Sequence, residues 1–140
     1  RDEARRQLER IGYDRVEGYL KGGLTAWETT GRELGRVGAI SVDELEAARR
    51  GAEPPLVLDV RGADEVDEGR LSGAQHVHLG QVPTVTPKLP TDRPVVAFCG
   101  SGERALIAAS LLRRAGLRDV SVCLGSMMAW TARRFPTEVG

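Results

Sequence analysis

The sequence predicts an α/β fold: an open, mainly parallel sheet with helices on both faces. Short apolar runs rich in β-branched residues recur from residue 39 onward, as buried strands require. A segment of helical period follows most of these runs before the next begins, and this alternation is typical of parallel sheets. The composition agrees, because 41% of the 140 residues are hydrophobic and 29% are charged, as in ordinary globular domains.

The first predicted element of this alternation is a helix over residues 41–50. Ser41 is followed three residues later by Glu44, a capping box that marks a helix start, and Gly51 supplies the stop. The next element is a buried strand in the apolar run "PPLVLDVR", residues 54–61, because two prolines precede a β-branched stretch.

The remaining elements follow in order along the chain. They are a turn with one or two helical turns (62–74), a short strand (74–79), a loop with room for a short helix (80–94), a strand (95–98), a helix stopped by a glycine (103–116), a strand (119–124) and a last helix (126–135). Residues 37–140 are therefore expected to form one complete domain. Ligands of such open sheets bind beyond the carboxyl ends of the strands.

Residues 1–36 do not complete a unit of their own. They predict a helix (4–12), a strand (14–20) and a second helix (22–31), and the same order recurs over 105–135, with "DRV" against "RDV" and "GGLTAW" against "GSMMAW". The segment is interpreted as the C-terminal remnant of a preceding module. Because so few elements cannot bury a core, we expect it to dock on the second module or on another chain, which would make a homodimer. Its instant removal by limited proteolysis would contradict this expectation.

Charge and composition exclude several classes of function. Twenty basic residues balance twenty acidic ones, so neither a nucleic-acid groove nor a polybasic membrane surface is expected. No apolar run approaches the roughly 20 residues of a membrane span, and no signal-peptide pattern is present. Two cysteines are too few for a disulfide framework and fit a reducing compartment, so a cytoplasmic location is expected. Because the first residue is Arg1 and not Met, we expect a piece of a longer protein.

The stretch "VVAFCGSGERA" carries the candidate active site. Cys99 ends a strand directly before a helix that begins near Glu103, so the amides of the intervening loop can curl around its sulfur. The positive end of the helix dipole also favours thiolate over thiol. We expect Cys99 to be a nucleophile, and the alternative is a buried structural thiol. The expected sulfur-binding loop consists of Gly100, Ser101, Gly102, Glu103 and Arg104.

Glycines and arginines shape this predicted site. Gly100 and Gly102 allow close backbone approach and positive φ without a Cβ penalty. Arg104 adds a fixed positive charge and a fork of donors. It either contacts an anionic substrate or supports the loop through Asp59, at the end of a neighbouring strand. Arg61, just after that strand, is expected in a charge pair at the sheet edge.

In their order and spacing, the stretches "LVLDVRGADEVDEGRLSGAQHVHL", "PVVAFCGSGERA" and "VSVCLGSMMAW" resemble the rhodanese (sulfurtransferase) family over about residues 39–137. The resemblance implies a rhodanese-like open, mainly parallel five-stranded sheet, with no cofactor and no metal. It makes Cys99 the acceptor of sulfane sulfur from a small donor, with the amides of 100–104 holding the persulfide until a thiol or cyanide-type acceptor removes the sulfur.

The truncated module ahead of a complete one resembles a particular arrangement. In some bacterial fusions, a metallo-β-lactamase-fold persulfide dioxygenase precedes an inactive and then an active rhodanese module. The resemblance implies such a dioxygenase as a fused or separate partner, with residues 1–36 as the end of the inactive module.

The residues directly after Cys99 also bear on the chemical identity of the sulfur donor. Thiosulfate-using relatives often carry basic residues directly after the cysteine, whereas this chain has Gly100, and "CGSG" looks more like the loop of mercaptopyruvate sulfurtransferases. Thiosulfate, a low-molecular-weight persulfide and mercaptopyruvate stay open as donors. Ser126, at the start of the last helix, either donates to the substrate or is a simple N-cap.

Other notable side chains have both a structural and a functional interpretation. Cys123 lies in an apolar strand, which favours a core position over a resolving cysteine. His76 and His78 share one face of a strand, but two ligands without a third make a weak case for a metal site. Core positions, and not a binding stripe, are also expected for the large side chains at Trp27, Met127, Met128 and Trp130.

Three functions compete on these observations. The leading hypothesis is a sulfurtransferase. A phosphatase of the same fold needs five residues between its cysteine and arginine, whereas four separate Cys99 from Arg104, so the cradle fits a sulfur better than a phosphate. The alternative is a non-catalytic sulfur carrier or interaction module of a larger sulfide-oxidising enzyme, with a stable persulfide but little turnover of free donors.

Overall fold

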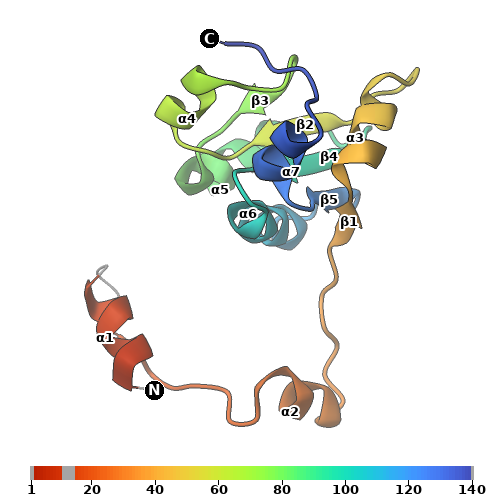
Figure 1. The fold of residues 1–140 in the computed structure, drawn as a ribbon. Helices are drawn as coiled ribbons and strands as arrows, with labels where there is room; N and C mark the ends of the chain where they lie inside the picture. Colours follow the sequence, from red (N-terminus) through yellow and green to blue (C-terminus); the bar gives the residue numbers. More distant parts are fainter. Residues whose placement is uncertain (1, 11–14, 140) are drawn as a thin grey trace. The chain divides into compact units, whose positions relative to one another are not determined.

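The computed structural model describes residues 2–10 and 15–139, and the chain divides into two compact units, residues 1–35 and 36–140. The second unit holds a sheet with helices packed around it, and the first holds two short helices (Figure 1). In the described ranges, no helix combines the length and apolar character needed to cross a bilayer.

The sheet of the second unit has five strands, and every pairing is parallel. In chain order the strands are β1 (Gly38–Ile40), β2 (Leu56–Asp59), β3 (Gln75–His76), β4 (Val95–Phe98) and β5 (Val120–Cys123). Their spatial order is β1-β5-β4-β2-β3. The predicted fold class is confirmed, with a sheet that is wholly parallel. The fifth strand, β1, was not among the elements predicted from the residues, because three residues are too few to show a period.

Helices cover both faces of this sheet. They are α3 (Val42–Arg49), α4 (Ala63–Glu68), α5 (Val82–Val85), α6 (Glu103–Arg114) and α7 (Ser126–Ala132), with 3₁₀ turns at Leu79–Gln81 and Thr86–Lys88. Side chains of β2 alternate between the faces: Leu58 belongs to the apolar cluster that includes α5 and α6, and Val57 to the cluster that includes α3 and α7. The strands therefore lie buried between two helical layers, as a parallel sheet requires.

The predicted capping signals are confirmed. The Ser41 hydroxyl accepts the Glu44 amide at 3.2 Å, and the Glu44 carboxylate accepts the Ser41 amide at 2.8 Å. The helix ends where the Gly51 amide donates to the Ala48 carbonyl at 3.1 Å. Gly116 closes α6 with φ +102°, a conformation that favours glycine.

In the first unit, the two predicted helices are confirmed with slightly different bounds, and the predicted strand between them is wrong. The helices are α1 (Asp2–Arg10) and α2 (Gly23–Thr29). The glycine at which the first was predicted to stop, Gly12, lies outside the described residues, as does Asp14 at the start of the predicted strand. Residues 15–20 form no strand, because an extended segment becomes a strand only when a neighbouring strand accepts its hydrogen bonds.

Candidate active site

Cys99 is the first residue after β4, and α6 begins four residues later. Its side chain is fully buried and belongs to the same apolar cluster as Val60 and Ala105. The Gly102 amide donates to the Cys99 sulfur at 3.1 Å. The sulfur thus sits inside a backbone loop at the carboxyl end of the sheet, where the sequence placed it, and it is shielded from solvent.

The corner between β5 and α7 holds this loop in place. The Cys99 amide donates to the Ser126 hydroxyl at 3.1 Å, and that hydroxyl donates to the Cys123 carbonyl at 2.9 Å. The amides of Met127 and Met128 donate to the carbonyls of Cys99 and Gly100 at 3.0 and 2.9 Å. Ser126 is fully buried, and the N-cap of α7 is the preceding glycine. Its hydroxyl therefore joins the ends of two strands, and serves neither as an N-cap nor as a group that faces solvent.

The middle of the loop depends on a glycine. Gly102 has φ +114°, and a Cβ there would lie 3.5 Å from the Gly125 amide nitrogen. A side chain at this position would be strained by the backbone conformation itself. Ser101 and Glu103 are exposed on either side of it, and Glu103 stands in the first turn of α6, where a negative charge stabilises the helix dipole.

Arg104 pairs with Glu65 and not with Asp59, so the predicted Asp59 contact is wrong. Its guanidinium donates to both carboxylate oxygens of Glu65, at 2.6 and 2.8 Å. This hydrogen bonding, with the positive charge beside it, lowers the pKa of Glu65 to about 2 and raises the pKa of Arg104. The ion pair lies directly over Gly100 of the loop: a Cβ added to Gly100 would be only 3.0 Å from the Arg104 Nη2 atom.

Asp59 is instead the partner of Arg61. The two side chains are almost fully buried and meet through bonds of 2.7 to 3.0 Å. The Arg61 guanidinium also donates to the carbonyls of Glu65 and Gly69, at 2.9 and 2.7 Å. The predicted charge pair is confirmed, but it lies in the interior and not at the sheet edge. It fixes α4, which carries Glu65, and so supports the loop indirectly.

An open cleft of about 610 Å³ lies beside this loop. Its lining comes from the end of β2, from α4, from the loop and the start of α6, and from α7: Arg61, Glu65, Glu68, Gly100, Ser101, Arg104, Met127, Met128, Thr131 and Ala132. Met128 is 70% exposed, so its predicted core position is wrong, and Met127 is half-buried. Adjacent helix residues point about 100° apart, and Trp130, which is fully buried as predicted, already fills the core side of α7.

The remaining polar candidates take structural positions. Cys123 is fully buried as predicted, and burial raises the pKa of its thiol to about 12. The His76 ring lies 2.9 Å from the Arg61 carbonyl, and the His78 ring accepts the Gly80 amide at 3.3 Å. Among residues 2–10 and 15–139, no group of three or more His, Cys, Asp or Glu side chains is placed to hold a metal ion.

Comparisons with known proteins agree with this architecture. Residues 41–133 match the rhodanese-like domain. YtwF of Bacillus subtilis (strain 168) is 33% identical over 97 residues, which cover 69% of this chain and 93% of YtwF. An Allochromatium vinosum protein named as a sulfurtransferase is 28% identical over 100 residues, which cover 71% of this chain and 94% of that protein. The solution structure of the rhodanese-like domain from the Alr3790 protein of Anabaena sp. matches with a TM-score of 0.66 at 28% identity, covering 74% of this chain and 80% of that one.

Proposed function

The chain belongs to the rhodanese-like domain family, and we propose that it is a sulfurtransferase in which Cys99 carries the sulfur as a persulfide. The observation that carries the proposal is the geometry of the loop. The Gly102 amide already donates to the Cys99 sulfur, and three hydrogen bonds to the β5–α7 corner hold the backbone of Cys99 and Gly100. A loop that is rigid before the reaction loses little entropy when it binds the terminal sulfur.

The reaction proceeds by two displacements. The Cys99 thiolate attacks the outer sulfur of a donor R–S–SH, so that a new S–S bond forms, the old one breaks, and R–S⁻ leaves with its electron pair. An acceptor thiolate then attacks the outer sulfur of the Cys99 persulfide, carries it away as a new persulfide, and restores the Cys99 thiolate. Each step exchanges one S–S bond for another, so neither an oxidant nor a metal is consumed.

A sulfur carrier is the alternative function, and the burial of Cys99 favours it. A free donor has to move the covering side chains to reach this sulfur, whereas a fused or associated enzyme, such as a persulfide dioxygenase, delivers or withdraws sulfur through a fitted interface. The carrier therefore keeps a stable persulfide and turns over free donors slowly. A phosphatase stays disfavoured, since four residues separate Cys99 from Arg104.

The test compares wild type with Cys99→Ser, and uses Cys123→Ser as a control that removes the other thiol. After treatment with thiosulfate, an alkyl persulfide or mercaptopyruvate, intact-mass analysis is expected to show the gain of one sulfur atom on wild type and Cys123→Ser. Cys99→Ser should gain none, and its turnover should fall by more than about a thousandfold. Absence of the adduct on folded wild type with all three donors contradicts the proposal. An adduct without turnover selects the carrier.

A further inference from the structure

We propose that Glu65 sets the donor specificity of this site by neutralising Arg104, and that the preferred donor is an alkyl persulfide, which carries at most one negative charge, and not dianionic thiosulfate. The inference rests on the proposed sulfurtransferase function and names the substrate class of the same cleft. Four features of the cleft carry it: the occupation of both arginines, an additional acid, the crowding above Gly100, and an apolar wall.

Neither arginine of the cleft presents an unpaired positive charge to an anion. Arg61 is 3% exposed and is bonded to Asp59 and to two backbone carbonyls. Arg104 is partly exposed, but both of its terminal nitrogens donate to Glu65. A sulfonate or carboxylate that approaches Arg104 has to compete with a bidentate carboxylate already in place.

Glu65 is itself held in position. Its Oε2 atom also accepts the Gly62 amide at 3.0 Å, at the start of α4, and the helix dipole favours a negative charge there. The carboxylate therefore has partners on two sides. Displacing it from Arg104 by a small anion exchanges a fixed partner for a mobile one, which is unfavourable.

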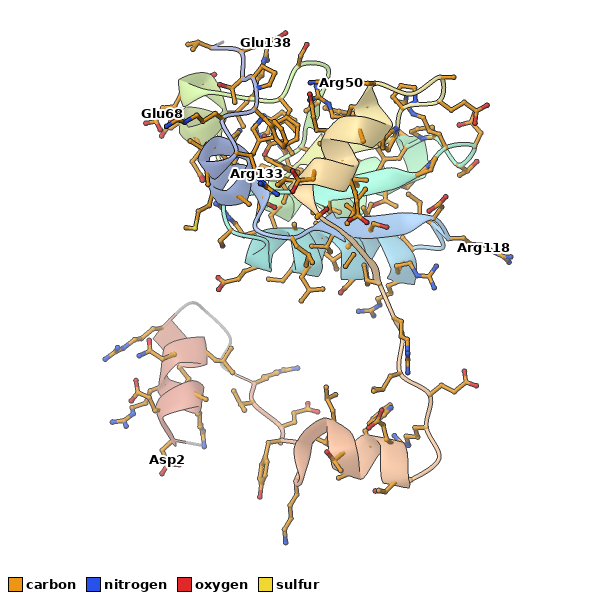
Figure 2. The ribbon with its side chains drawn as sticks, turned by 45° about the vertical axis from the view of Figure 1, so that its right-hand side comes forward. Asp2, Arg50, Glu68, Arg118, Arg133 and Glu138 are labelled. Carbon is orange, nitrogen blue, oxygen red and sulfur yellow. The ribbon has the colours of Figure 1, made fainter. Side chains whose placement is uncertain are left out.

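The wall that carries Glu65 adds a second acid. Glu68, at the end of α4, lines the same cleft and points outward into solvent (Figure 2). Among the described residues, no cation lies within ion-pair distance of it. Since Asp59 neutralises Arg61 and Glu65 neutralises Arg104, Glu68 gives the cleft a net negative charge, which repels a dianion.

The ion pair also occupies the space above the residue that follows the nucleophile. A Cβ on Gly100 would meet Arg104 Nη2 at 3.0 Å and Glu65 Oε1 at 3.7 Å. A basic side chain at this position, which would attract a dianion, would have to displace the pair. The Glu65–Arg104 pair can therefore take this position only because residue 100 is a glycine.

The opposite wall offers contact area to an apolar group. Met128 is 70% exposed in the cleft, with the half-buried Met127 and the exposed Ala132 in the same lining. Methionine side chains adapt to different apolar shapes, and each methylene that a donor buries there contributes about 0.8 kcal/mol. An alkyl persulfide has such a group, whereas thiosulfate has only its sulfonate oxygens.

Both donors use balanced chemistry, so they differ only in recognition. With an alkyl persulfide, Cys99–S⁻ and R–S–SH give Cys99–S–SH and R–S⁻. With thiosulfate, Cys99–S⁻ and S–SO₃²⁻ give Cys99–S–S⁻ and sulfite, SO₃²⁻. In each case one S–S bond forms as another breaks.

The experiment measures kcat/KM of the full chain for N-acetylcysteamine persulfide and for thiosulfate. Wild type is expected to favour the persulfide. Glu65→Gln keeps the shape and the amide contact of Glu65 but removes its charge, and should raise kcat/KM for thiosulfate by about five- to tenfold, the size expected of a partly exposed charge. Asp67→Asn is the matched control, because it removes the same charge from an exposed site on α4 outside the cleft. It should change the thiosulfate value by less than about twofold.

Two further measurements keep the test independent of one variant. Added salt should raise the wild-type kcat/KM for thiosulfate, since screening weakens repulsion; a decrease would indicate an attractive, positive site and overturn the inference. Met128→Ser should lower kcat/KM for the alkyl persulfide about threefold more than it lowers kcat/KM for thiosulfate, because only the persulfide contacts the apolar wall.

The outcomes separate the two proposals. If Cys99 gains no sulfur from either donor, the sulfurtransferase function itself fails. If Cys99 gains sulfur from both, but wild type favours thiosulfate or Glu65→Gln leaves the donor ratio unchanged, the function stands and the role of Glu65 is wrong.

Discussion

Residues 22–27 and 125–130 share the pattern Gly-x-x-x-Ala-Trp, and they fold alike. The first residue of each has a left-handed φ, +86° in Gly22 and +69° in Gly125, and so has the second, +62° in Gly23 and +44° in Ser126. A Cβ on either leading glycine would clash with the alanine four residues later, at 2.8 and 2.6 Å. Both turns open a seven-residue helix.

The segments that precede these turns differ completely. Residues 15–20 form no strand, whereas β5 pairs with β1 on one side and β4 on the other. A turn and a short helix satisfy their backbone groups within a few residues, but a strand satisfies them only through its neighbours. The repeated sequence therefore reproduces the local geometry, but among the residues that the structure describes only the second copy follows a strand of a sheet.

The largest expected difference lies between the two tryptophans. Trp130 is fully buried, with its ring edge-on to Phe98 and Phe135 at 6.3 and 5.0 Å, whereas Trp27 is partly exposed. Trp130→Ala should lower the free energy of unfolding by about 3–5 kcal/mol, and Trp27→Ala by about 1 kcal/mol or less. Urea unfolding followed by circular dichroism measures both. Equal losses would mean that the first unit packs its tryptophan as tightly as the second.

A smaller difference is expected at the second turn position, where Ser126 stands against Gly23. Ser126→Gly copies the first unit and removes the strain of positive φ, but it leaves the buried Cys99 amide without its acceptor. The lost hydrogen bond costs about 1–3 kcal/mol, and the relieved strain, about 1–2 kcal/mol for a single residue, offsets only part of that cost. We therefore expect a net loss near 1 kcal/mol with a larger fall in sulfur transfer, because the loop loses an anchor.

Thermal unfolding and donor turnover of Ser126→Gly test this expectation together. Ser126→Ala serves as the comparison variant, since it loses the same hydroxyl while keeping the strained backbone and should be the less stable of the two. Unchanged turnover in both variants would show that the β5–α7 corner does not support the site.

The smallest expected effect is the contribution of the Glu65–Arg104 ion pair to the free energy of unfolding at different pH. In the first unit the described ion pairs join residues three or four apart on α1, whereas Glu65 and Arg104 are 39 residues apart. The folded pKa of Glu65, about 2, lies below its usual value of 4.5. Its contribution to stability is therefore present above about pH 4.5 and is lost as the pH falls towards 2.

Because Glu65 is 43% exposed and solvent screens the pair, the loss should be about 1 kcal/mol or less. The midpoint of urea unfolding, measured from pH 6 down to pH 2.5, should fall more in wild type than in Glu65→Gln. Glu9→Gln, which removes the Arg5 pair on α1, should leave the wild-type profile unchanged. Parallel profiles for wild type and Glu65→Gln would show that the pair does not stabilise the fold.

Most of the fold could be predicted from the sequence, because its signals are local. The capping box of Ser41 and Glu44, the glycine stop at Gly116 and the buried run of β4 each depend on a few neighbouring residues. The position of Cys99 at a strand end followed from the same reasoning. What failed were β1, too short to show a period, and the strand predicted at 14–20, which has the residues of a strand but no partner in the described part of the first unit.

By itself, the sequence determined the α/β alternation, the place of the cysteine and the length of the loop that ends at Arg104. The tertiary structure decided which groups meet there: Glu65 with Arg104, Asp59 with Arg61, and Ser126 with the Cys99 amide. The physical reason is the distance along the chain over which each interaction acts. Backbone turns and helix ends are governed by interactions over three or four residues, but the partner of a charged side chain depends on which helix the sheet brings across the loop.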